Sequence, residues 1–539
     1  MCNYRARLSR VAPFVSGREV NPEQIVPVLE AVIEPGDRVC IEGNNQKQAD
    51  FLAKSLIKTD PARVRDLHLV QSVLALPEHI ELIERGQVRR IDFCFSGPQS
   101  VRLAKLVEQG RIEIGAIHTY VELYGRYFMD LTPRVSLIAA RAADHAGNLY
   151  TGPNTEDTPT IVEATAFKNG IVIAQVDEVV DRLPRVDIPS DWVDFFVKAP
   201  TPHYTEPLFT RDPAAITDAQ ILMGMMTIKG FYAEYGITSL NHGIGFATAA
   251  IELLLPTYAA ELGLKGKICT HWALNPHPTL IPAIEAGFVE SVHCFGSEVG
   301  MEQYVEARPD VFFVGRDGSL RSNRAFCQMA GHYACDLFIG STLQIDLAGN
   351  SSTATKGRIT GFGGAPNLGG NATGRRHPSP AWLRAGREAH PHAVMPQGRK
   401  LVAQIVESAR KATQPAFVER LDAWDLAASA KMALPPVMIY GEDVTHIITE
   451  EGIAHLVRCV TPEEREQAIR GVAGSTRVGL GRDTRMVENL RDRGIIRRPE
   501  DIGINPRDAS RDLLAAHTMK DLVDASGGLY DPPERFRNW

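Results

Sequence analysis

The sequence has no pair of cysteines at the two-residue spacing typical of zinc and redox sites. Its eight cysteines are scattered over 539 residues, mostly within apolar runs. This scatter excludes a disulfide framework and predicts reduced, buried thiols. The candidate metal ligands His271, His277, His293 and Cys294 match neither an HExxH nor a CxxC pattern. We therefore expect no bound metal.

An excess of positive charge and a long uninterrupted apolar run are also missing. The formal net charge is −7, with both signs mixed along the chain, which excludes a dedicated nucleic-acid or anionic-membrane surface. Residues 1–17 lack a basic-then-apolar signal pattern. The longest apolar stretch, about residues 244–262, contains Glu252, Pro256 and Glu261. It predicts core helices in a cytoplasmic protein instead of a membrane span.

Alternating strand and helix patterns run along both halves of the chain and predict an α/β fold. Such alternation is typical of open, parallel-rich sheets covered by helices. We predict two α/β domains that face each other across a cleft, at residues 1–210 and 211–485, followed by a C-terminal extension at 486–539. In the second half we expect strands at residues 267–271, 289–295, 336–346 and 444–449, the last leading into a helix.

The sequence Ser-Glu-Val-Gly at residues 297–300 directly follows the strand expected at 289–295. A carboxylate in a loop after a core strand lies where open α/β sheets carry chemistry. The alternative is a helix N-terminal carboxylate favoured by the helix dipole. Further on, residues 356–365 form a glycine turn with Gly361, Gly363 and Gly364, whose backbone N–H groups could face a developing negative charge. Together the two motifs suit acyl transfer between a thioester and a free acid.

Two further loops are candidates for binding. Residues 43–49, Gly-Asn-Asn-Gln-Lys-Gln-Ala, follow a short strand and precede a helix, so their amides predict a ligand site, although a tight connection is the alternative. Residues 243–245, Gly-Ile-Gly, are a partial dinucleotide motif whose third glycine is missing. Residues 375–377, Arg-Arg-His, either contact phosphates of a ligand or form a solvated loop.

Four motifs in the second half resemble the class I coenzyme A transferase family and occur in the family's order over about residues 236–456. Residues 297–300 are similar to the family's Ser-Glu-Asn-Gly signature, with Val299 in place of the asparagine. The other three matches are residues 240–245, the strand and glycine turn within 340–365, and residues 444–450. Weaker matches in the first half are Ser96-Gly97, residues 144–148 and residues 187–189.

Within that family, residues 43–49 and the long single chain resemble the alpha subunits of malonate decarboxylases. The resemblance implies two class I transferase-like domains and an enzyme that exchanges acetate for malonate on a carrier-protein thioester. It implies as partners an acyl carrier protein, the catalytic subunits of a decarboxylase, malonate and acetate. It also implies that the chain binds no cofactor of its own and acts on the phosphoribosyl-dephospho-coenzyme A arm of the carrier.

These motifs suggest roles for individual residues. We expect Glu298 to attack the acetyl thioester and form a mixed anhydride, and the N–H groups of Gly363, Gly364 and Ile244 to stabilise the oxyanion. The predicted substrate-binding residues lie in loops that follow strands: Asn44, Asn45, Gln46, Gly243, Gly245, Ser96 and Gly97.

Three alternatives remain open from the sequence. A free acetyl-coenzyme A:carboxylate transferase would use the same carboxylate with a different thiol. A nucleotide-binding oxidoreductase would use residues 243–245, and bound nicotinamide or flavin absorbance would reveal it. A non-catalytic scaffold would bind the carrier protein without exchanging labelled acetate into the acetyl thioester.

Overall fold

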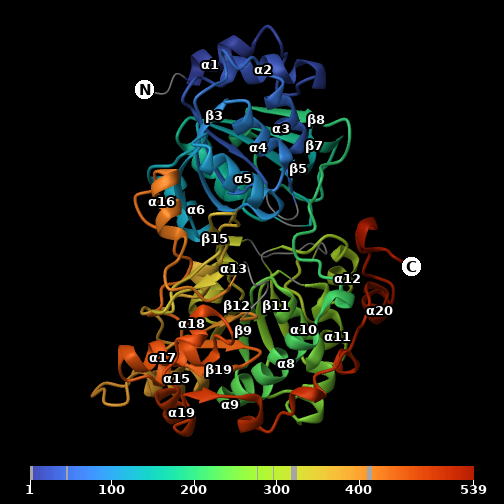
Figure 1. Cartoon of the computed structure of the whole chain (residues 1–539). Helices are drawn as coiled ribbons and strands as arrows, with labels where there is room; N and C mark the ends of the chain where they lie inside the picture. The colour runs from blue at the N-terminus through green and yellow to red at the C-terminus, as the bar shows by residue number, and fades with distance from the viewer. Residues whose placement is uncertain are drawn as a thin grey trace.

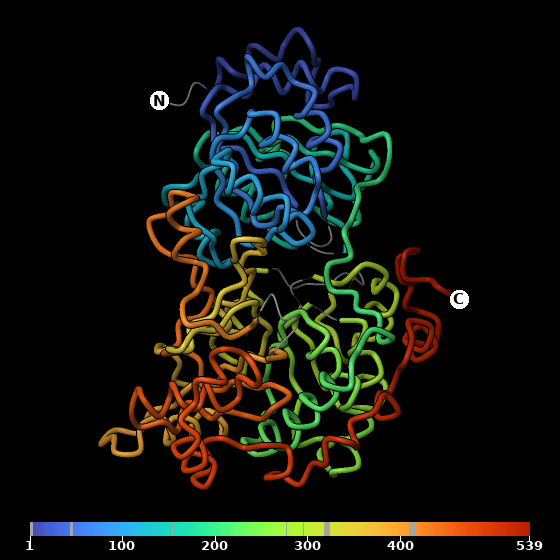
Figure 2. Tube along the Cα trace, in the orientation of Figure 1, coloured from blue at the N-terminus to red at the C-terminus, as the bar shows by residue number. Residues whose placement is uncertain are grey.

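The computed structural model describes residues 4–43, 47–153, 155–275, 277–294, 296–316, 324–408 and 415–539. Two sheets, one in each half of the chain, form the centres of two units. In Figure 1 the N-terminal unit, blue to cyan, lies above the unit built from the rest of the chain. Figure 2 shows the green segment between β8 and residue 213 running from one unit to the other. The boundary predicted at residue 210 falls within this segment.

The first sheet has the strand order β4-β3-β2-β1-β5-β7-β8, with β6 beside β5. Every neighbouring pair is parallel except β5 and β6. Its strands are β1 Arg38–Ile41, β2 Leu67–Val73, β3 Val88–Phe95, β4 Glu113–Ile117, β5 Val135–Asp144, β6 Leu149–Tyr150, β7 Ile171–Val180 and β8 Phe195–Lys198. The main helices of this unit are α2 Ile25–Val32, α3 Asp50–Ile57, α4 Pro77–Glu84, α5 Ser100–Glu108, α6 Tyr120–Met129 and α7 Thr158–Phe167.

The second sheet has the order β11-β10-β9-β12-β17-β18-β19-β20. It is parallel up to β18 and antiparallel from there to its edge. Its strands are β9 Ser239–His242, β10 His271–Ala273, β11 Ser291–His293, β12 Leu337–Gly340, β17 Leu401–Ile405, β18 His446–Thr449, β19 Gly452–His455 and β20 Ile496–Arg497. Its main helices are α8 Asp218–Thr227, α10 Phe246–Leu254, α11 Ile281–Glu285, α12 Glu302–Ala307, α13 Arg324–Tyr333, α15 Pro380–Ala389, α17 Pro462–Val472, α19 Thr484–Asp492 and α20 Met519–Ala525.

Local sequence explains these elements. α8 begins with a capping box, because the Thr217 side chain accepts from the Gln220 amide and the Gln220 side chain accepts from the Thr217 amide. α10 is buried along most of its length, as expected for the apolar stretch around Glu252. β2 and β5 are buried on both faces, which is why both read as nearly continuous apolar runs. Among the described residues, no helix is long and apolar enough to cross a membrane.

Each sheet reverses its strand order once, between β1 and β5 in the first sheet and between β9 and β12 in the second. Ligands of open α/β sheets bind beyond the carboxyl ends of the strands at such a reversal. Loops at the carboxyl ends of β9 and β12 line the cavity described below.

The glycine turn of the second unit joins the end of β3 in the first. The Cys94 carbonyl accepts from the amides of Phe362 at 2.6 Å and Gly363 at 2.8 Å, and the Ser96 amide donates to the Thr360 carbonyl at 2.8 Å. Figure 1 also shows α16, Ala423–Ala430, beside the first unit, where it packs against α5. The two units therefore share backbone hydrogen bonds as well as side-chain packing.

The sequence Asp-x-Ala-Gly-Asn occurs in both units and forms the same turn twice. The Asp144 carboxylate accepts from the Asn148 amide at 2.9 Å and from its side chain at 2.8 Å. The Asp346 carboxylate accepts from the same two groups of Asn350, at 2.9 and 3.0 Å. Both occurrences of this sequence therefore have a structural role. A turn shared in this way is typical of related units.

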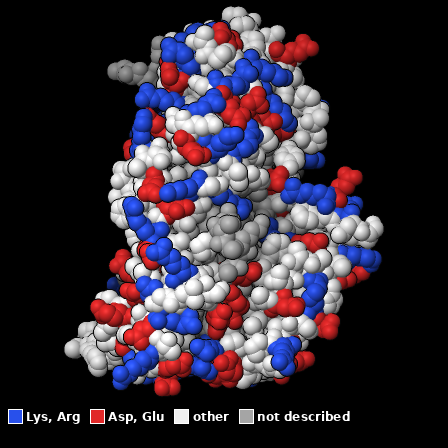
Figure 3. Space-filling model, in the orientation of Figure 1, with Lys and Arg blue, Asp and Glu red and all other residues white. Residues whose placement is uncertain are grey.

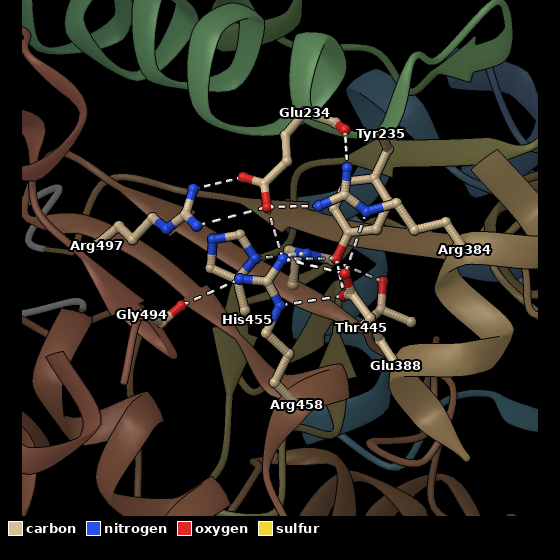
Figure 4. A network of polar contacts seen from close by, with 10 residues as sticks. Glu234, Tyr235, Arg384, Glu388, Thr445, His455, Arg458, Gly494 and Arg497 are labelled. Atoms are coloured by element: carbon tan, nitrogen blue, oxygen red, sulfur yellow. Dashed lines mark hydrogen bonds and ion pairs between the residues drawn. The ribbon is translucent and has the colours of Figure 1, made fainter. Parts of the chain in front are cut away.

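A polar network far from the first sheet stabilises the other end of the second unit (Figure 4). Glu234 accepts from Arg384, Arg458 and Arg497, and Glu388 accepts from Arg458 and Tyr235. His446, from the motif at 444–450, stacks against Phe231 and lies within this core. That motif therefore has a packing role in the part of the chain described here.

Several details differ from the sequence-based expectations. Residues 267–270 are not a strand, because Cys269 has a φ of 58°, and β10 begins at His271. The strand expected over 336–346 ends at Gly340, and a short hairpin strand follows at Gln344–Ile345. Residues 452–455 form an antiparallel strand instead of a helix. The boundary predicted at 485/486 lies inside α19, and β20 pairs with β19 in the second sheet.

Acidic and basic side chains are interspersed over the face drawn in Figure 3. That face shows no single-sign field, in agreement with the mixed charge of the sequence.

The Gly361→Ala variant should destabilise the junction between the units. Gly361 has a φ of 81°, and a Cβ there would lie 2.5 Å from the Cys94 carbonyl oxygen and 2.9 Å from the Phe95 Cα. Strain and backbone displacement together should cost about 2 kcal/mol or more, measured by chemical denaturation. Gly357→Ala is the matched control, because a Cβ there meets no atom within 4 Å. Equal stabilities of the two variants would contradict this account of the junction.

Candidate functional site

A cavity of about 180 Å³ lies where the loops of the two units meet. The first unit contributes Phe95 and Tyr120, and the second contributes loops after β9, β10 and β12 together with the glycine turn. Asn275 follows β10 and Ser341 follows β12, the two strands that flank β9, and both residues line the cavity. This enclosed position between two domains is where ligand sites usually occur.

Glu298 is buried next to this cavity without lining it. Its Oε1 accepts from the Thr210 hydroxyl at 3.0 Å and from the Thr210 amide at 3.3 Å, while Oε2 has no partner among the described residues. The preceding residue in that segment, Phe209, lines the cavity with its ring. Burial raises the pKa of Glu298 to about 8, although the Thr210 hydrogen bonds and nearby Arg211 oppose the shift. The loop therefore holds a carboxylate with one oxygen fixed and one available.

A second buried carboxylate reaches the same loop from the first unit. A Cβ on Gly296 would lie 2.2 Å from Glu156 Oε1, so only glycine allows this approach. Glu156 pairs with the guanidinium of Arg324, which lines the cavity and lies 4.4 Å from the Tyr120 ring centroid. Burial raises the pKa of Glu156 to about 7, against the opposing effect of Arg324.

A histidine pair, His242 and His277, also lines the cavity. His277 lines the cavity, stacks on Phe209 at 5.6 Å between ring centroids, and shares Glu252 with His242 through Nδ1 contacts of 3.0 and 2.9 Å. Although burial opposes ionisation, the two histidines lower the pKa of Glu252 to about 2. The buried carboxylate therefore orients both rings. No group of three or more described His, Cys, Asp or Glu residues is placed to hold a metal ion.

The glycine turn supplies fewer amide donors than expected. Gly363 and Gly364 both line the cavity, but the Gly363 N–H donates to the Cys94 carbonyl. Because the Gly363 N–H is already hydrogen-bonded, it cannot donate to an oxyanion in this conformation. The N–H groups of Ile244 and Gly364 have no acceptor among the described residues, and both residues line the cavity.

The remaining predicted binding residues divide into three groups. Gly243 lines the cavity, and Gly245 lines a neighbouring hollow at the start of α10. Ser96 and Gly97 do not line the cavity, and the Ser96 hydroxyl donates to the Ile359 carbonyl, so it supports the glycine turn. Asn44, Asn45 and Gln46 lie outside the described residues.

Arg375 is not available to the phosphates considered from sequence. It is buried, pairs with Asp336 at 2.9 Å and lies over the Trp382 ring.

Sequence reasoning missed the polar residues that surround the cavity: Glu156, Asn275 and Arg324. Their positions follow no local motif, because they come from three separate loops or helices that meet only in the fold. A signal was present for His277, which was considered only as a metal ligand. Glu252 in an apolar helix was a second signal, since a buried carboxylate needs partners.

The model of the family described as malonate decarboxylase, alpha subunit, transporter, matches residues 1–539. The acetyl-S-ACP:malonate ACP transferase of Malonomonas rubra is 59% identical over 538 residues, which cover 99% of this chain and 97% of that protein. Two solved structures are similar over 99% of this chain and 98% of their own. One, a Pseudomonas malonate decarboxylase hetero-tetramer in complex with malonate, has a TM-score of 0.96 and 59% identity. The other, the alpha subunit of an Acinetobacter baumannii malonate decarboxylase, has a TM-score of 0.94 and 55% identity.

More distant structures share the fold alone. A putative citrate lyase alpha subunit from Streptococcus mutans has a TM-score of 0.59 at 15% identity, covering 91% of this chain and 86% of that one. An acyl-CoA transferase from Escherichia coli O157:H7 has a TM-score of 0.53 at 15% identity, with 82% and 89% covered. The predicted fold class, two transferase-like α/β domains with parallel-rich sheets, is confirmed.

The buried position of Glu298 should make stability depend on pH. Its raised pKa, about 8, means that between about pH 5 and 8 the folded chain keeps a proton that the unfolded chain has lost. Stability therefore falls as the pH rises through this window. Glu298→Gln cannot ionise, so its unfolding temperature minus that of the unchanged protein should be larger at pH 8 than at pH 5. Glu306→Gln on the exposed face of α12 is the control, and an equal difference at both pH values for Glu298→Gln would refute the assignment.

Proposed function

The chain belongs to the family of malonate decarboxylase alpha subunits, and we propose that it moves a carrier-protein thiol from acetate to malonate. The reaction converts acetyl carrier protein and malonate into malonyl carrier protein and acetate. The observation that carries the residue assignment is Glu298, a buried loop carboxylate beside the cavity whose Oε2 has no partner in the described part of the chain.

Glu298 acts as the nucleophile in four balanced steps. Its carboxylate oxygen attacks the acetyl carbonyl carbon and the carrier thiolate leaves, which gives an acetyl-glutamyl anhydride. The thiolate attacks the glutamyl carbonyl and acetate leaves, which gives a glutamyl thioester. Malonate attacks that thioester and releases the thiolate, forming a malonyl-glutamyl anhydride. The thiolate then attacks the malonyl carbonyl and regenerates the Glu298 carboxylate.

Each tetrahedral intermediate places a negative charge on a former carbonyl oxygen. The N–H groups of Ile244 and Gly364 are the donors for that oxygen in this proposal, since both line the cavity and neither has an internal acceptor. Loss of one such donor in other enzymes costs about 3 kcal/mol of transition-state stabilisation. Gly363 supports this pair indirectly, because its bond to Cys94 holds the turn against the first unit.

The hydrogen bonds from Thr210 orient the Glu298 carboxylate for attack. Thr210 fixes Oε1 and leaves Oε2 for attack, and Glu298 is 0% exposed. A thioester therefore reaches Oε2 only after a local shift of the segment around Phe209 and Thr210. Burial excludes water, which protects the anhydride and thioester intermediates from hydrolysis.

The proposed partners follow from the same reaction. The acyl carrier protein delivers the thiol at the end of a phosphoribosyl-dephospho-coenzyme A arm, and the other subunits of a malonate decarboxylase use the malonyl thioester. The chain itself then needs no resident cofactor. Asn44, Asn45 and Gln46, which follow β1 in the sequence, remain proposed contacts for the acid or the arm.

Exchange through Glu298 should give ping-pong kinetics and a covalently modified enzyme. The enzyme is incubated with acetyl carrier protein alone and then treated with hydroxylamine or borohydride. The peptide containing Glu298 should be modified, and malonate added before this treatment should prevent the modification. Glu298→Gln, of nearly equal size, should lose more than about 90% of the rate, or roughly 1.4 kcal/mol of barrier. Sequential kinetics with an unmodified peptide would instead mean direct attack by malonate on the acetyl donor.

The carrier-protein thioester should be a much better donor than free acetyl-coenzyme A. A carrier adds a protein–protein contact that raises the local concentration of its arm at the cavity. Specificity constants for the two donors, measured with the same malonate concentration, test this expectation. A higher constant for acetyl-coenzyme A would assign the chain to the ordinary coenzyme A transferases.

A further inference from the structure

We propose that Arg324, assisted by Asn275, binds the second carboxylate of malonate and so selects a dicarboxylic acid over acetate. The inference rests on the proposed function, because it names how that site distinguishes its two acids. The acetyl and malonyl groups share the carboxyl carbon that reacts with Glu298. They differ in the carboxylate that malonate carries on its other end.

Arg324 is a buried cation with unused donors. The residue is 1% exposed and lines the cavity, yet its Nε and Nη1 have no acceptor among the residues that the structure describes. Only Nη2 is engaged, with Glu156. A buried donor without an acceptor is unfavourable, and more so when it is charged. An anionic ligand in the cavity would remove this cost.

Asn275 points to the same ligand independently. It is 1% exposed and lines the same cavity, and within the described part of the chain neither its Oδ1 nor its Nδ2 has a partner. An amide with both ends unsatisfied in an enclosed space is the arrangement expected of a binding group whose ligand is missing. Its Nδ2 donates to a carboxylate, whereas its Oδ1 would accept from the carboxylic acid form or a bound water.

The surroundings favour one small dianion. Arg324 is the only lysine or arginine among the described residues that line the cavity. Tyr120 lies against its guanidinium at 4.4 Å, which restricts the orientation of the cation. The volume of about 180 Å³ suits a small acid beside the end of a thioester arm. A second carboxylate left unpaired here would pay a large desolvation cost, so pairing with Arg324 separates malonate from a monocarboxylic acid.

The test compares malonate and acetate as acceptors for the same acetyl carrier protein, using labelled acids and the full-length chain. Arg324→Gln should lower the ratio of kcat/KM for malonate to that for acetate by about 10- to 100-fold. Arg324→Lys keeps the charge and should lower the ratio less, and Asn275→Ala should lower it by a smaller factor than Arg324→Gln. An unchanged ratio in Arg324→Gln would overturn the inference.

Arg375→Gln is the matched control. Arg375 is also a buried arginine with an acidic partner and an aromatic ring beneath it, but it does not line the cavity. Its replacement should reduce stability and leave the malonate-to-acetate ratio unchanged. A fall in the ratio equal to that of Arg324→Gln would show a general effect of losing a buried arginine and would count against the proposal.

A binding measurement separates failure of this inference from failure of the proposed function. Malonate alone should raise the unfolding temperature of the unchanged chain more than acetate at the same concentration and ionic strength, and Arg324→Gln should lose that difference. This result supports the carboxylate site even if no acid exchanges with the thioester, in which case the proposed reaction fails alone. Equal stabilisation by the two acids in the unchanged chain would overturn the site while leaving Glu298 chemistry intact.

Discussion

Backbone hydrogen bonds between the end of β3 and the glycine turn are the constraint on which the rest of the site depends. The Cys94 carbonyl accepts from two successive amides of the turn, and Ser96 pairs with Thr360. These bonds cross from one unit to the other, so they fix the glycine turn of the second unit against the strand ends of the first. Gly361 is required because its positive φ and the nearby β3 backbone leave no room for a Cβ. With this junction in place, residues of both units line one cavity.

The packing of the two units determines the pKa values of the carboxylates beside the cavity. Glu298 and Glu156 both lose water, and burial raises the pKa of each, to about 8 and about 7. A carboxyl group with such a raised pKa is destabilised as an anion. Once it is ionised, it therefore attacks a carbonyl carbon more readily. Arg324 compensates one of the two carboxylates directly. Among the described lining residues Arg324 is the only arginine or lysine, and besides its contact with Glu156 its Nε and Nη1 meet no described acceptor.

Sequence reasoning predicted the fold class and most strands correctly because parallel strands are buried and alternate with helices. It failed where the backbone leaves regular structure at the site: β12 ends at Gly340, where the chain turns at the cavity. It identified the region of Glu298 from local glycine patterning. It could not predict Arg324 or Asn275 as cavity residues, since their roles depend on contacts between segments far apart in the chain. The number of free N–H donors in the glycine turn could not be predicted from the sequence either, because the carbonyl that accepts from Gly363 lies in the other unit.

The loop of Glu298 is held from both sides by distant parts of the chain, and this double restraint explains why its conformation is specific. Glu156 of the first unit packs against Gly296, and near the C-terminus the Asp531 amide donates to the Gly300 carbonyl at 2.9 Å. Tyr530, buried beside Glu298, fills the space between the tail and the loop. The last residues are therefore part of the site's support, although their sequence resembles a polar extension. In the exchange that we propose, each transfer depends on the same approach to one oxygen of Glu298, and a fixed loop keeps that approach constant.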